Sequence, residues 1–378
     1  MTTECTGGTW TYAMDLAEGL AAYDVEVTLF VSGGPLTLQR MVEAGLHPNL
    51  RLVRSELKLE WMNAPEADLA ETDAILRDLA AEIRPDIIHI NGYANAAAGF
   101  DAPVVSVAHS CVATRWRAVH GAAAPWEWDA YRTRLRRGVA AADCLVAPTA
   151  AHLKAFCAEH GEPRNARVIH NGRSDSFQPE GEKVPFALAA GRFWDEGKNL
   201  SILREVAPLT RYPIALIGEM MSEQEQAASL PSESGITPPT ARGLTTFGRV
   251  DAPQLEHTMA QASVFVAPAR YEPFGLAVLE AARAKMALVL GDIPTMRELW
   301  DGVARFAPPN DAEAFAAAID ALLDDPAAAA SEGAAARDRA IAYSMVATTR
   351  AYMDLYTDLS GVLMKADATD TSPFGLVP

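Results

Sequence analysis

Two carboxylates lie eight positions apart in the stretch YEPFGLAVLEAARA, which is otherwise almost wholly apolar. Glu272 precedes a helical pattern, and Glu280 lies inside its apolar run. A buried carboxylate costs free energy unless hydrogen-bond donors pair with it, so Glu280 needs a partner. A pair of sugar hydroxyl groups would donate to both of its oxygens. A salt bridge to Arg283 or Arg297 would also satisfy it, and the residues alone leave both explanations open.

The same stretch offers backbone donors to an anion. A strand pattern runs into a proline-containing loop, and the following helix is expected to start near Gly275. The amides of Phe274, Gly275 and Leu276 would then be unpaired donors at the positive end of a helix. Glu272 would lie in the loop, at the mouth of such a site.

Two further stretches have the composition of phosphate-binding loops. In GRFWDEGKNLSIL, Arg192 ends an apolar strand and Lys198 lies in the loop before a helix. Two cations at this spacing can hold a diphosphate from two sides, although solvated surface cations would look the same. In TGGTWTYAMDL, Gly7 and Gly8 stand directly before a helix, where glycines let backbone amides approach an anion. A plain tight turn would need the same two glycines.

Polar residues or glycines also follow several other apolar runs. They are Asn91, His109, His170, Asn171, Gly218 and Arg249. In open parallel sheets, ligands bind beyond the carboxyl ends of the strands, so the fold would gather such residues at one edge. A packed or capping role is the alternative for any one of them.

Ten short apolar runs alternate with helical patterns along the chain. They span residues 25–32, 86–91, 103–109, 143–148 and 166–171 in the first half, and 186–192, 212–219, 245–249, 262–268 and 286–292 in the second. Continuous apolar strands joined by helices indicate parallel sheets covered on both faces. Two sets of five predict an α/β protein with two doubly wound domains.

A polar linker over residues 171–185 indicates the boundary between these domains. We therefore expect a first domain over residues 1–172 and a second over residues 173–344. A last helix, over about residues 345–366, is expected to pack back on the first domain, and residues 367–378 to form a flexible tail.

Composition excludes several classes of partner. The chain has 378 residues, 49% of them apolar, and a net charge of −17, which argues against a nucleic-acid binder because phosphate neutralisation needs a basic surface. The charge also weakens attachment to anionic membranes. An arginine-rich segment, residues 131–138, is the local exception and forms either a solvated helix face or an anion or acceptor patch. Four cysteines without metal spacing, no signal segment and no membrane span predict a soluble cytoplasmic protein.

Together these stretches resemble the retaining glycosyltransferases of family 4, which have the GT-B fold of two facing Rossmann-like domains. The family's E-x7-E signature corresponds to Glu272 and Glu280. GRFWDEGKNL, VIHNG, VAHS, GDIPTMREL and the N-terminal GG-x-W support it in the expected order. One departure is that the family has a full apolar strand before the glycine loop, whereas only MTTECT precedes Gly7.

The resemblance implies a UDP-, GDP- or ADP-sugar donor held mainly by the second domain, without a cofactor or a metal. Arg192 and Lys198 would hold the donor diphosphate, Glu280 the ribose hydroxyls, and Glu272 would lie beside the transferred hexose. His109 would contact that sugar near its reacting carbon. The remaining donor-binding residues would be Gly7, Gly8, Asn171, Gly218, Arg249, Phe274, Gly275 and Leu276.

The acceptor would be a soluble sugar or small molecule bound by the first domain. Candidates on that side are Trp10, Asn91, Tyr93, Arg115 and Trp116, whose aromatic rings would stack on sugar faces unless they pack in the core. The alternatives to a transferase are a non-catalytic nucleotide-sugar binder or another GT-B enzyme, such as a sugar-nucleotide epimerase or a phosphorylase.

Overall fold

The computed structural model describes residues 1–174, 177, 179–218 and 238–361. Its strands form two groups, one in each domain. Within each group, every pair of neighbouring strands is parallel. The first group is β1 (Thr2–Glu4), β2 (Val27–Ser32), β3 (Leu50–Arg54), β4 (Ile88–Ile90), β5 (Val104–Val107), β6 (Cys144–Ala147) and β7 (Ala166–Val168). The second is β8 (Val184–Ala190), β9 (Pro213–Ile217), β10 (Gly243–Thr246), β11 (Ala262–Ala267), β12 (Ala287–Gly291) and β13 (Arg305–Ala307).

Both groups reverse their strand order at the centre of the sheet. The second has the order β10-β9-β8-β11-β12-β13, so its direction of winding changes between β8 and β11. In the first, β1-β2-β3 and β4-β5-β6-β7 are joined by Asn91, which follows β4 and donates from its backbone N to Thr2 Oγ1 (3.0 Å) and from Nδ2 to Thr2 O (2.8 Å). The first switch point therefore lies between β1 and β4.

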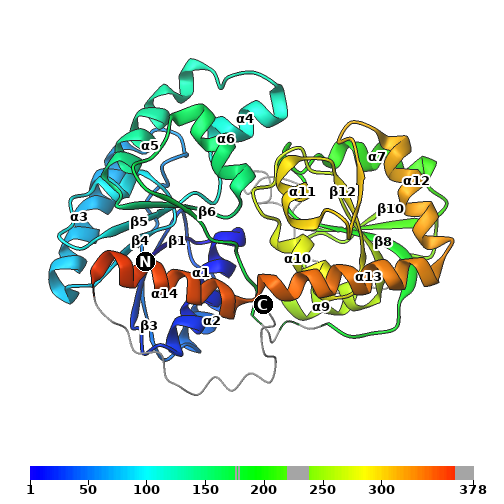
Figure 1. Ribbon diagram of the computed structural model, residues 1–378, viewed down its shortest axis with the longest axis horizontal. Helices are drawn as coiled ribbons and strands as arrows, with labels where there is room; N and C mark the ends of the chain where they lie inside the picture. Colours follow the sequence, from blue (N-terminus) through cyan, green and yellow to red (C-terminus); the bar gives the residue numbers. More distant parts are fainter. Residues whose placement is uncertain (175–176, 178, 219–237, 362–378) are drawn as a thin grey trace, which may run out of the picture.

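Helices cover both faces of each sheet (Figure 1). Those of the first domain are α1 (Gly7–Ala21), α2 (Leu38–Gly45), α3 (Glu66–Ile83), α4 (Val112–His120), α5 (Asp129–Ala141) and α6 (Ala150–His160). Those of the second are α7 (Leu200–Leu209), α9 (Ala252–Gln261), α10 (Leu276–Arg283), α11 (Pro294–Trp300), α12 (Ala312–Leu323) and α13 (Pro326–Ala340). Three short 3-10 helices are η1 (Ala94–Ala97), η2 (Trp126–Trp128) and η3 (Ile341–Tyr343), and the last helix is α14 (Met345–Ser360).

Burial on both faces explains why the strands are continuously apolar. In β12, Leu288 and Leu290 pack in the cluster beneath α10, while Ala287 and Val289 pack in the cluster beneath α12. Successive side chains of a strand point to opposite faces, so a strand covered on both sides has no polar position. Each of the ten predicted apolar runs overlaps a strand. The sequence prediction missed β1, β3 and β13, which are short or carry polar residues.

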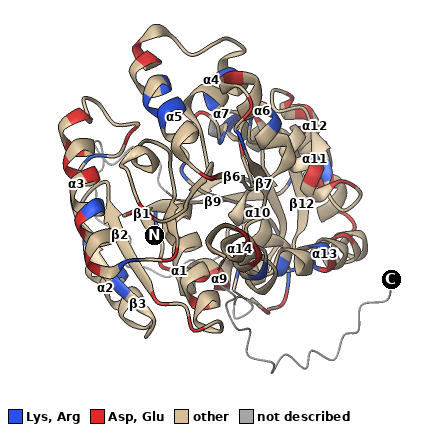
Figure 2. Ribbon diagram, turned by 60° about the vertical axis from the view of Figure 1, so that its left-hand side comes forward, with Lys and Arg blue, Asp and Glu red and all other residues tan. Residues whose placement is uncertain are grey.

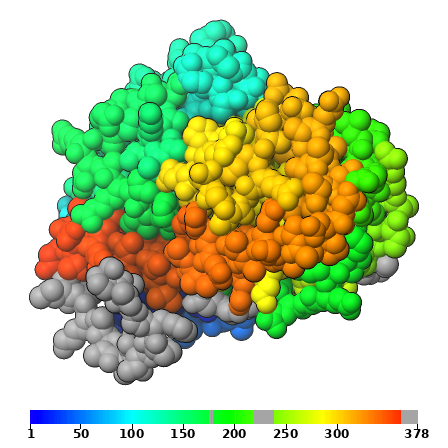
Figure 3. Space-filling view, turned by 45° about the vertical axis from the view of Figure 1, so that its right-hand side comes forward, coloured from blue at the N-terminus to red at the C-terminus, as the bar shows by residue number. Residues whose placement is uncertain are grey.

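The last helix returns to the first domain, as expected. Tyr352, Leu355 and Tyr356 of α14 are buried in the same cluster as Leu16 of α1. Figure 3 shows α13 and α14 running end to end along one side of both domains. The predicted tail, residues 367–378, lies outside the described residues.

The chain passes between the domains twice, and the two passages pair with each other. Arg173 N donates to Tyr343 O (3.3 Å), and Met345 N donates to Arg173 O (3.0 Å). A Cβ on Gly172 would lie 2.4 Å from Ser344 O, so no side chain fits there. We call residues 172–174 and 343–345 the crossing point.

The arginine-rich segment forms part of α5. Figure 2 shows basic residues on α5 and acidic residues along α3. Arg134 donates to Glu66 Oε1 (2.7 Å) and to Glu60 O (3.0 Å), and Arg132 pairs with Asp129. These two arginines therefore serve contacts within the first domain, whereas Arg136 and Arg137 are exposed.

Candidate functional site

The glycine loop of the first domain meets the start of α10 in the second. A Cβ on Gly8 would lie 3.5 Å from Leu276 Cδ1, and one on Gly7 would lie 4.0 Å from Arg192 Nη1. Gly7 has φ +76° and Gly275 has φ +89°, a backbone conformation that side chains disfavour. The structure therefore brings Gly7, Gly8, Arg192 and Leu276 together across the two domains.

Two helices begin at this place without a side-chain cap. The residues before α1 and α10, Thr6 and Gly275, make no side-chain capping bond, and neither helix has an acidic residue in its first turn. The first amides of a helix have no intrahelical acceptor and carry a partial positive charge. An anion between the domains would thus meet two helix N-termini and the Arg192 guanidinium.

Arg192 and Lys198 differ in their surroundings. Lys198 forms an ion pair with Glu272, and both side chains are largely buried. Arg192 is exposed and lies over the ring of Trp194 (5.4 Å to its centroid), and no carboxylate among the described residues pairs with it. Of the two predicted diphosphate ligands, Arg192 is available in this structure, whereas Lys198 would have to exchange Glu272 for the donor.

Glycine at position 218 allows the ends of two strands to approach. A Cβ there would lie 1.9 Å from Gly191 O, next to Arg192. Gly218 N also donates to Gly248 O (2.7 Å), which aligns the ends of β9 and β10. Arg249 follows the outer strand β10 and is exposed. Gly218 thus acts through the backbone that positions Arg192.

Glu280 has an arginine partner that the sequence did not suggest. Arg173 at the crossing point donates from Nε to Glu280 Oε1 (2.8 Å) and from Nη1 to both carboxylate oxygens of Asp15 in α1 (2.9 and 2.7 Å). The two anticipated partners are engaged elsewhere. Arg283 donates to Ser174 O (2.6 Å), and Arg297 pairs with Asp292 and Asp301.

Burial raises the pKa of both acids in this triad, and Arg173 opposes the rise. Burial alone would lower the pKa of Arg173. Glu280 and Asp15 outweigh this effect, so the pKa of Arg173 lies above its usual value. A ribose bound by Glu280 would therefore share the carboxylate with Arg173, and the ribose role of Glu280 stays a prediction.

His109 lies at the end of β5 in a chain of polar side chains. Its Nε2 lies 2.8 Å from Asn91 Oδ1, which is also 3.0 Å from His89 Nε2, and His89 Nδ1 lies 2.6 Å from Tyr356 OH in α14. Because Asn91 Nδ2 donates to Thr2 O, Oδ1 is the acceptor that faces both rings. Both histidines therefore carry their proton on Nε2.

This arrangement leaves His109 Nδ1 as a lone-pair acceptor, and none of the residues that the structure describes donates to it. Burial lowers the pKa of His109 and His89 to about 3, so both rings are neutral. His109 Nδ1 can thus accept a hydrogen bond from a ligand hydroxyl, while Asn91 holds the ring and does not itself contact the reacting atoms.

Several predicted acceptor-side residues have other roles. Trp10 is 2% exposed and donates to Glu43, and Tyr93 is 2% exposed and donates from its hydroxyl to Ser110 O. Neither ring is accessible for stacking on a sugar, because helix and strand packing cover it. Trp116 is half-buried against His120, with ring centroids 4.3 Å apart.

Other predicted residues lie in the core around the crossing point. Phe274 is buried, with its ring near those of His170 (6.3 Å) and Tyr343 (5.7 Å). Asn171 is 6% exposed, and its Oδ1 has no hydrogen-bond partner within the described ranges. Phe274 can therefore contribute only its backbone amide, as predicted, while Asn171 offers a buried acceptor.

The two domains are in contact through residues that sequence reasoning missed and through Arg115, which was predicted on the acceptor side but pairs with the second domain. Tyr271 OH accepts from Cys111 N (3.1 Å) and lies 3.0 Å from Thr114 Oγ1 at the start of α4. Arg115 donates to Asp195 (2.6 and 3.0 Å). Glu298 accepts from the first two amides of α6 (2.8 and 2.6 Å). Figure 3 shows the α4 region in contact with the α10–α11 region. The two domains therefore touch each other beside the predicted donor-binding residues.

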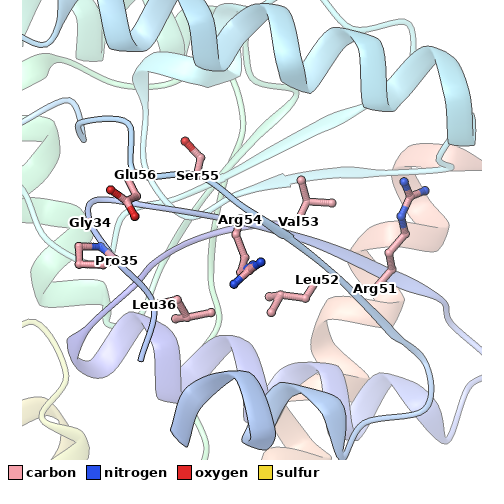
Figure 4. A pocket seen from close by; sticks show the side chains of 9 residues that line it. All are labelled: Gly34, Pro35, Leu36, Arg51, Leu52, Val53, Arg54, Ser55 and Glu56. Carbon is pink, nitrogen blue, oxygen red and sulfur yellow. The ribbon is translucent and has the colours of Figure 1, made fainter. Parts of the chain in front are cut away.

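An open groove of about 620 Å³ lies along the edge strand β3, away from these residues (Figure 4). Its lining includes Leu36, Arg54, Ser55 and Glu56. None of the predicted site residues lines it.

The sequence matches two family descriptions in tandem. Residues 6–177 match Glycosyltransferase Family 4, and residues 185–325 match Glycosyl transferases group 1. The chain belongs to the family 4 glycosyltransferases. This agrees with the signature carried by Glu272 and Glu280 and with the GT-B arrangement of two Rossmann-like domains.

Among curated relatives, the phosphatidyl-myo-inositol mannosyltransferase of Mycolicibacterium smegmatis is 30% identical over 52% of this family 4 chain and 50% of that protein. The chain thus spans about half the length of this relative. The D-inositol 3-phosphate glycosyltransferase of Streptomyces avermitilis is 28% identical over 93% of this chain and 83% of that protein.

Solved structures show the same fold. The sucrose-phosphate synthase of Thermosynechococcus elongatus has a TM-score of 0.74 at 21% identity, with 94% of each chain covered. The Anabaena HepE protein in complex with UDP-glucose has a TM-score of 0.69 at 18% identity, with 94% of this chain and 97% of that chain covered. Within the described residues, no helix of this family 4 protein is both long and apolar enough to cross a membrane.

Proposed function

We propose that this protein transfers a hexose from a nucleoside diphosphate sugar to a small acceptor, with retention of anomeric configuration and without a metal ion. The observation that carries the proposal is the meeting of the uncapped N-termini of α1 and α10 with Arg192 between the domains. Backbone amides and a guanidinium are the donors that a diphosphate requires. The UDP-glucose complex of the Anabaena HepE protein supports the same class of donor.

In the proposed reaction, the bond between the anomeric carbon and the phosphate oxygen breaks, and the acceptor oxygen bonds to the same carbon. The proton of the acceptor hydroxyl passes to the departing diphosphate. Negative charge grows on that diphosphate, where Arg192, Lys198 and the helix amides stabilise it. His109 accepts from a hydroxyl of the sugar through Nδ1, and contact between the domains excludes water.

Glu272 has two partners in this scheme. It pairs with Lys198 in the structure, and its backbone O accepts from Thr295 Oγ1 (2.6 Å), which fixes the loop. When the donor diphosphate draws Lys198 away, the Glu272 carboxylate becomes free to accept from the transferred sugar. The exchange couples donor binding to the placement of Glu272.

A direct test is a thermal-shift and calorimetry screen against UDP, GDP, ADP and their hexose conjugates, followed by donor hydrolysis without acceptor. We expect one nucleotide series to raise the melting temperature and its sugar conjugate to be hydrolysed slowly. Analysis of the product's anomeric configuration, with and without a chelator, tests retention and metal independence. Absence of binding to every nucleotide would refute the proposal, and tight binding without hydrolysis or transfer would indicate a non-catalytic binder.

Two of the similar proteins are named for a phosphorylated acceptor or product, the D-inositol 3-phosphate glycosyltransferase and the sucrose-phosphate synthase. The net charge of −17 gives no general reason to expect a phosphorylated partner here.

A further inference from the structure

Arg173 bridges the two domains from the crossing point. Its Nη1 donates to both carboxylate oxygens of Asp15 in α1 (2.9 and 2.7 Å), and its Nε donates to Glu280 Oε1 in α10 (2.8 Å). Its backbone is held as well, because Arg173 N donates to Tyr343 O and Arg173 O accepts from Met345 N. The guanidinium therefore has a fixed place between the two helices.

These two helices are the ones whose uncapped N-termini meet at the proposed diphosphate site. Asp15 lies about two turns into α1, and Glu280 lies about one turn into α10. In a nucleoside diphosphate the ribose is attached directly to the diphosphate. A ribose whose diphosphate lies at the N-terminus of α10 would therefore be within reach of Glu280.

The two carboxylate oxygens of Glu280 are not equivalent. Oε1 accepts a charge-assisted hydrogen bond from Arg173, whereas none of the residues that the structure describes donates to Oε2. The Glu280 side chain keeps 12% of its surface exposed, so a ligand can reach it. Oε2 is thus the stronger remaining acceptor, and a ribose that bound both oxygens equally would have to displace Arg173.

Arg173 also keeps the Glu280 carboxylate ionised. Burial raises the pKa of Glu280, and Asp15 and Glu256 add to the rise, whereas Arg173 lowers it. An ionised oxygen accepts a hydrogen bond about twice as strong as a neutral one does. Loss of Arg173 would therefore weaken the acceptor at Oε2 even if the Glu280 side chain stayed in place.

We propose that Arg173 is a positioning residue of the donor site, which orients Glu280 so that Oε2 accepts from one ribose hydroxyl and links this contact to α1 through Asp15. The inference rests on the proposed glycosyl transfer from a nucleoside diphosphate sugar. Arg173 acts through Glu280 and lies apart from the bond that breaks, so it affects donor binding and not the chemical step.

Binding of matched nucleotides tests this arrangement. The probes are the nucleoside diphosphate that the nucleotide screen identifies and its 2′-deoxy and 3′-deoxy analogues, each titrated by calorimetry. We expect one analogue to bind at least about tenfold more weakly than the ribonucleotide and the other less than about threefold, because Oε2 serves one hydroxyl. Comparable losses for both analogues, or no loss for either, would overturn the inference.

The larger of these two Kd ratios, which we call the hydroxyl ratio, separates positioning from a purely structural role. Arg173→Lys keeps a cation between the two acids but loses the planar fork that holds both. We expect it to lower the hydroxyl ratio below about threefold and to raise the donor KM about tenfold, with kcat within about threefold of the unaltered protein. A residue that only supported the fold would weaken ribonucleotide and analogue equally, so an unchanged hydroxyl ratio would overturn the inference.

Asp15→Asn is a second variant that leaves Arg173 and Glu280 as a balanced ion pair, so it should fold even if Arg173→Lys does not. It removes one of the two anchors of the guanidinium, and we expect the hydroxyl ratio to fall at least about threefold. An unchanged ratio would refute the link to α1. Arg211→Lys is the matched control, because Arg211 bridges Asp320 and Asp324 at the surface, and it should change neither the ratio nor the donor KM.

The two levels of the proposal fail in different ways. Absence of nucleotide binding and donor hydrolysis in the unaltered protein would refute glycosyl transfer itself. Normal binding and hydrolysis, combined with the same hydroxyl ratio in the unaltered protein, Arg173→Lys and Asp15→Asn, would refute only the positioning role of Arg173.

Discussion

At the scale of the residue, the two candidate diphosphate ligands are unequal. Arg192 is exposed and has no carboxylate partner in the described part of the chain, whereas Lys198 is held by Glu272. An unpaired guanidinium beside two helix N-termini can bind an incoming anion without first breaking an ion pair. Arg192 should therefore contribute mainly to the reaction and little to folding.

We expect Arg192→Ala to lower kcat for transfer by about 10²–10³-fold, the usual effect of removing one donor to a developing negative charge. The free energy of unfolding should stay within about 0.5 kcal/mol of the unaltered protein, as for other surface substitutions. Steady-state kinetics and urea unfolding measure the two effects. Arg51→Ala, at an exposed ion pair with Glu82, is the control, and a kcat for Arg192→Ala equal to that of this control would contradict the prediction.

The neutral histidine pair predicts a dependence of stability on pH. His89 and His109 have pKa values of about 3 in the folded protein, against about 6.5 when unfolded. Between these values the unfolded chain binds more protons, so stability falls as pH decreases from about 6.5 towards 3. Each such histidine contributes about 1.4 kcal/mol per pH unit in the lower part of this range.

Urea unfolding at about pH 7, 6 and 5 tests this linkage. We expect His89→Gln to be less stable than the unaltered protein at pH 7 and to lose stability less steeply on acidification. Two parallel curves would show that the pKa of His89 is the same in the folded and the unfolded protein and would contradict the assigned hydrogen bonds.

At the scale of the element, Arg173 connects α1, α10 and the crossing point. We expect Arg173→Met to lower the free energy of unfolding by about 3–5 kcal/mol, because it leaves Asp15 and Glu280 buried without a cation. Adding Asp15→Asn and Glu280→Gln to the same protein should recover most of this loss. Urea unfolding of the single and triple variants decides the point, and equal stability of the two would contradict it.

The contrast between predicted and observed elements has a physical cause. Continuous apolar runs such as 286–292 were recognisable because both faces of their strands are buried. The central strand β1 reads only Thr-Thr-Glu, and its pairing with β2 and its link to Asn91 come from tertiary structure. A local pattern could not reveal either contact.

The same limit applied to the site. Gly7, Gly8, Arg192 and Leu276 were predicted individually from the sequence, and the fold brings them together. Arg173 was missed because it lies in a polar linker, 107 residues from Glu280. Trp10 and Tyr93 were placed at an acceptor cleft because aromatic residues are common both in cores and at sugar sites, and sequence alone does not distinguish the two.

At the scale of the whole molecule, Tyr271 docks one domain on the other. Its hydroxyl lies among Cys111 N, Thr114 Oγ1 and Ser110 Oγ, and burial raises its pKa to about 12, so it stays protonated. We expect Tyr271→Phe to weaken this contact by about 1–2 kcal/mol, or a five- to thirtyfold shift towards separated domains.

Small-angle scattering with and without the donor nucleotide measures this shift. The radius of gyration of Tyr271→Phe should exceed that of the unaltered protein without nucleotide and decrease when nucleotide binds. Unchanged scattering together with unchanged kinetics would show that the contact does not control domain closure. Tyr212→Phe, which removes a surface hydroxyl bonded to Asp324, is the matched control.

The return of α14 to the first domain has a consequence for synthesis of the chain. Tyr352, Leu355 and Tyr356 fill the core beside α1, but a ribosome makes them after the entire second domain. Until α14 is made, the apolar side chains of the first domain that pack against it stay exposed to chaperones or to other nascent chains. Helix α1 is made early and α14 only after the second domain. The two helices therefore form one hydrophobic cluster only when α14 leaves the ribosome.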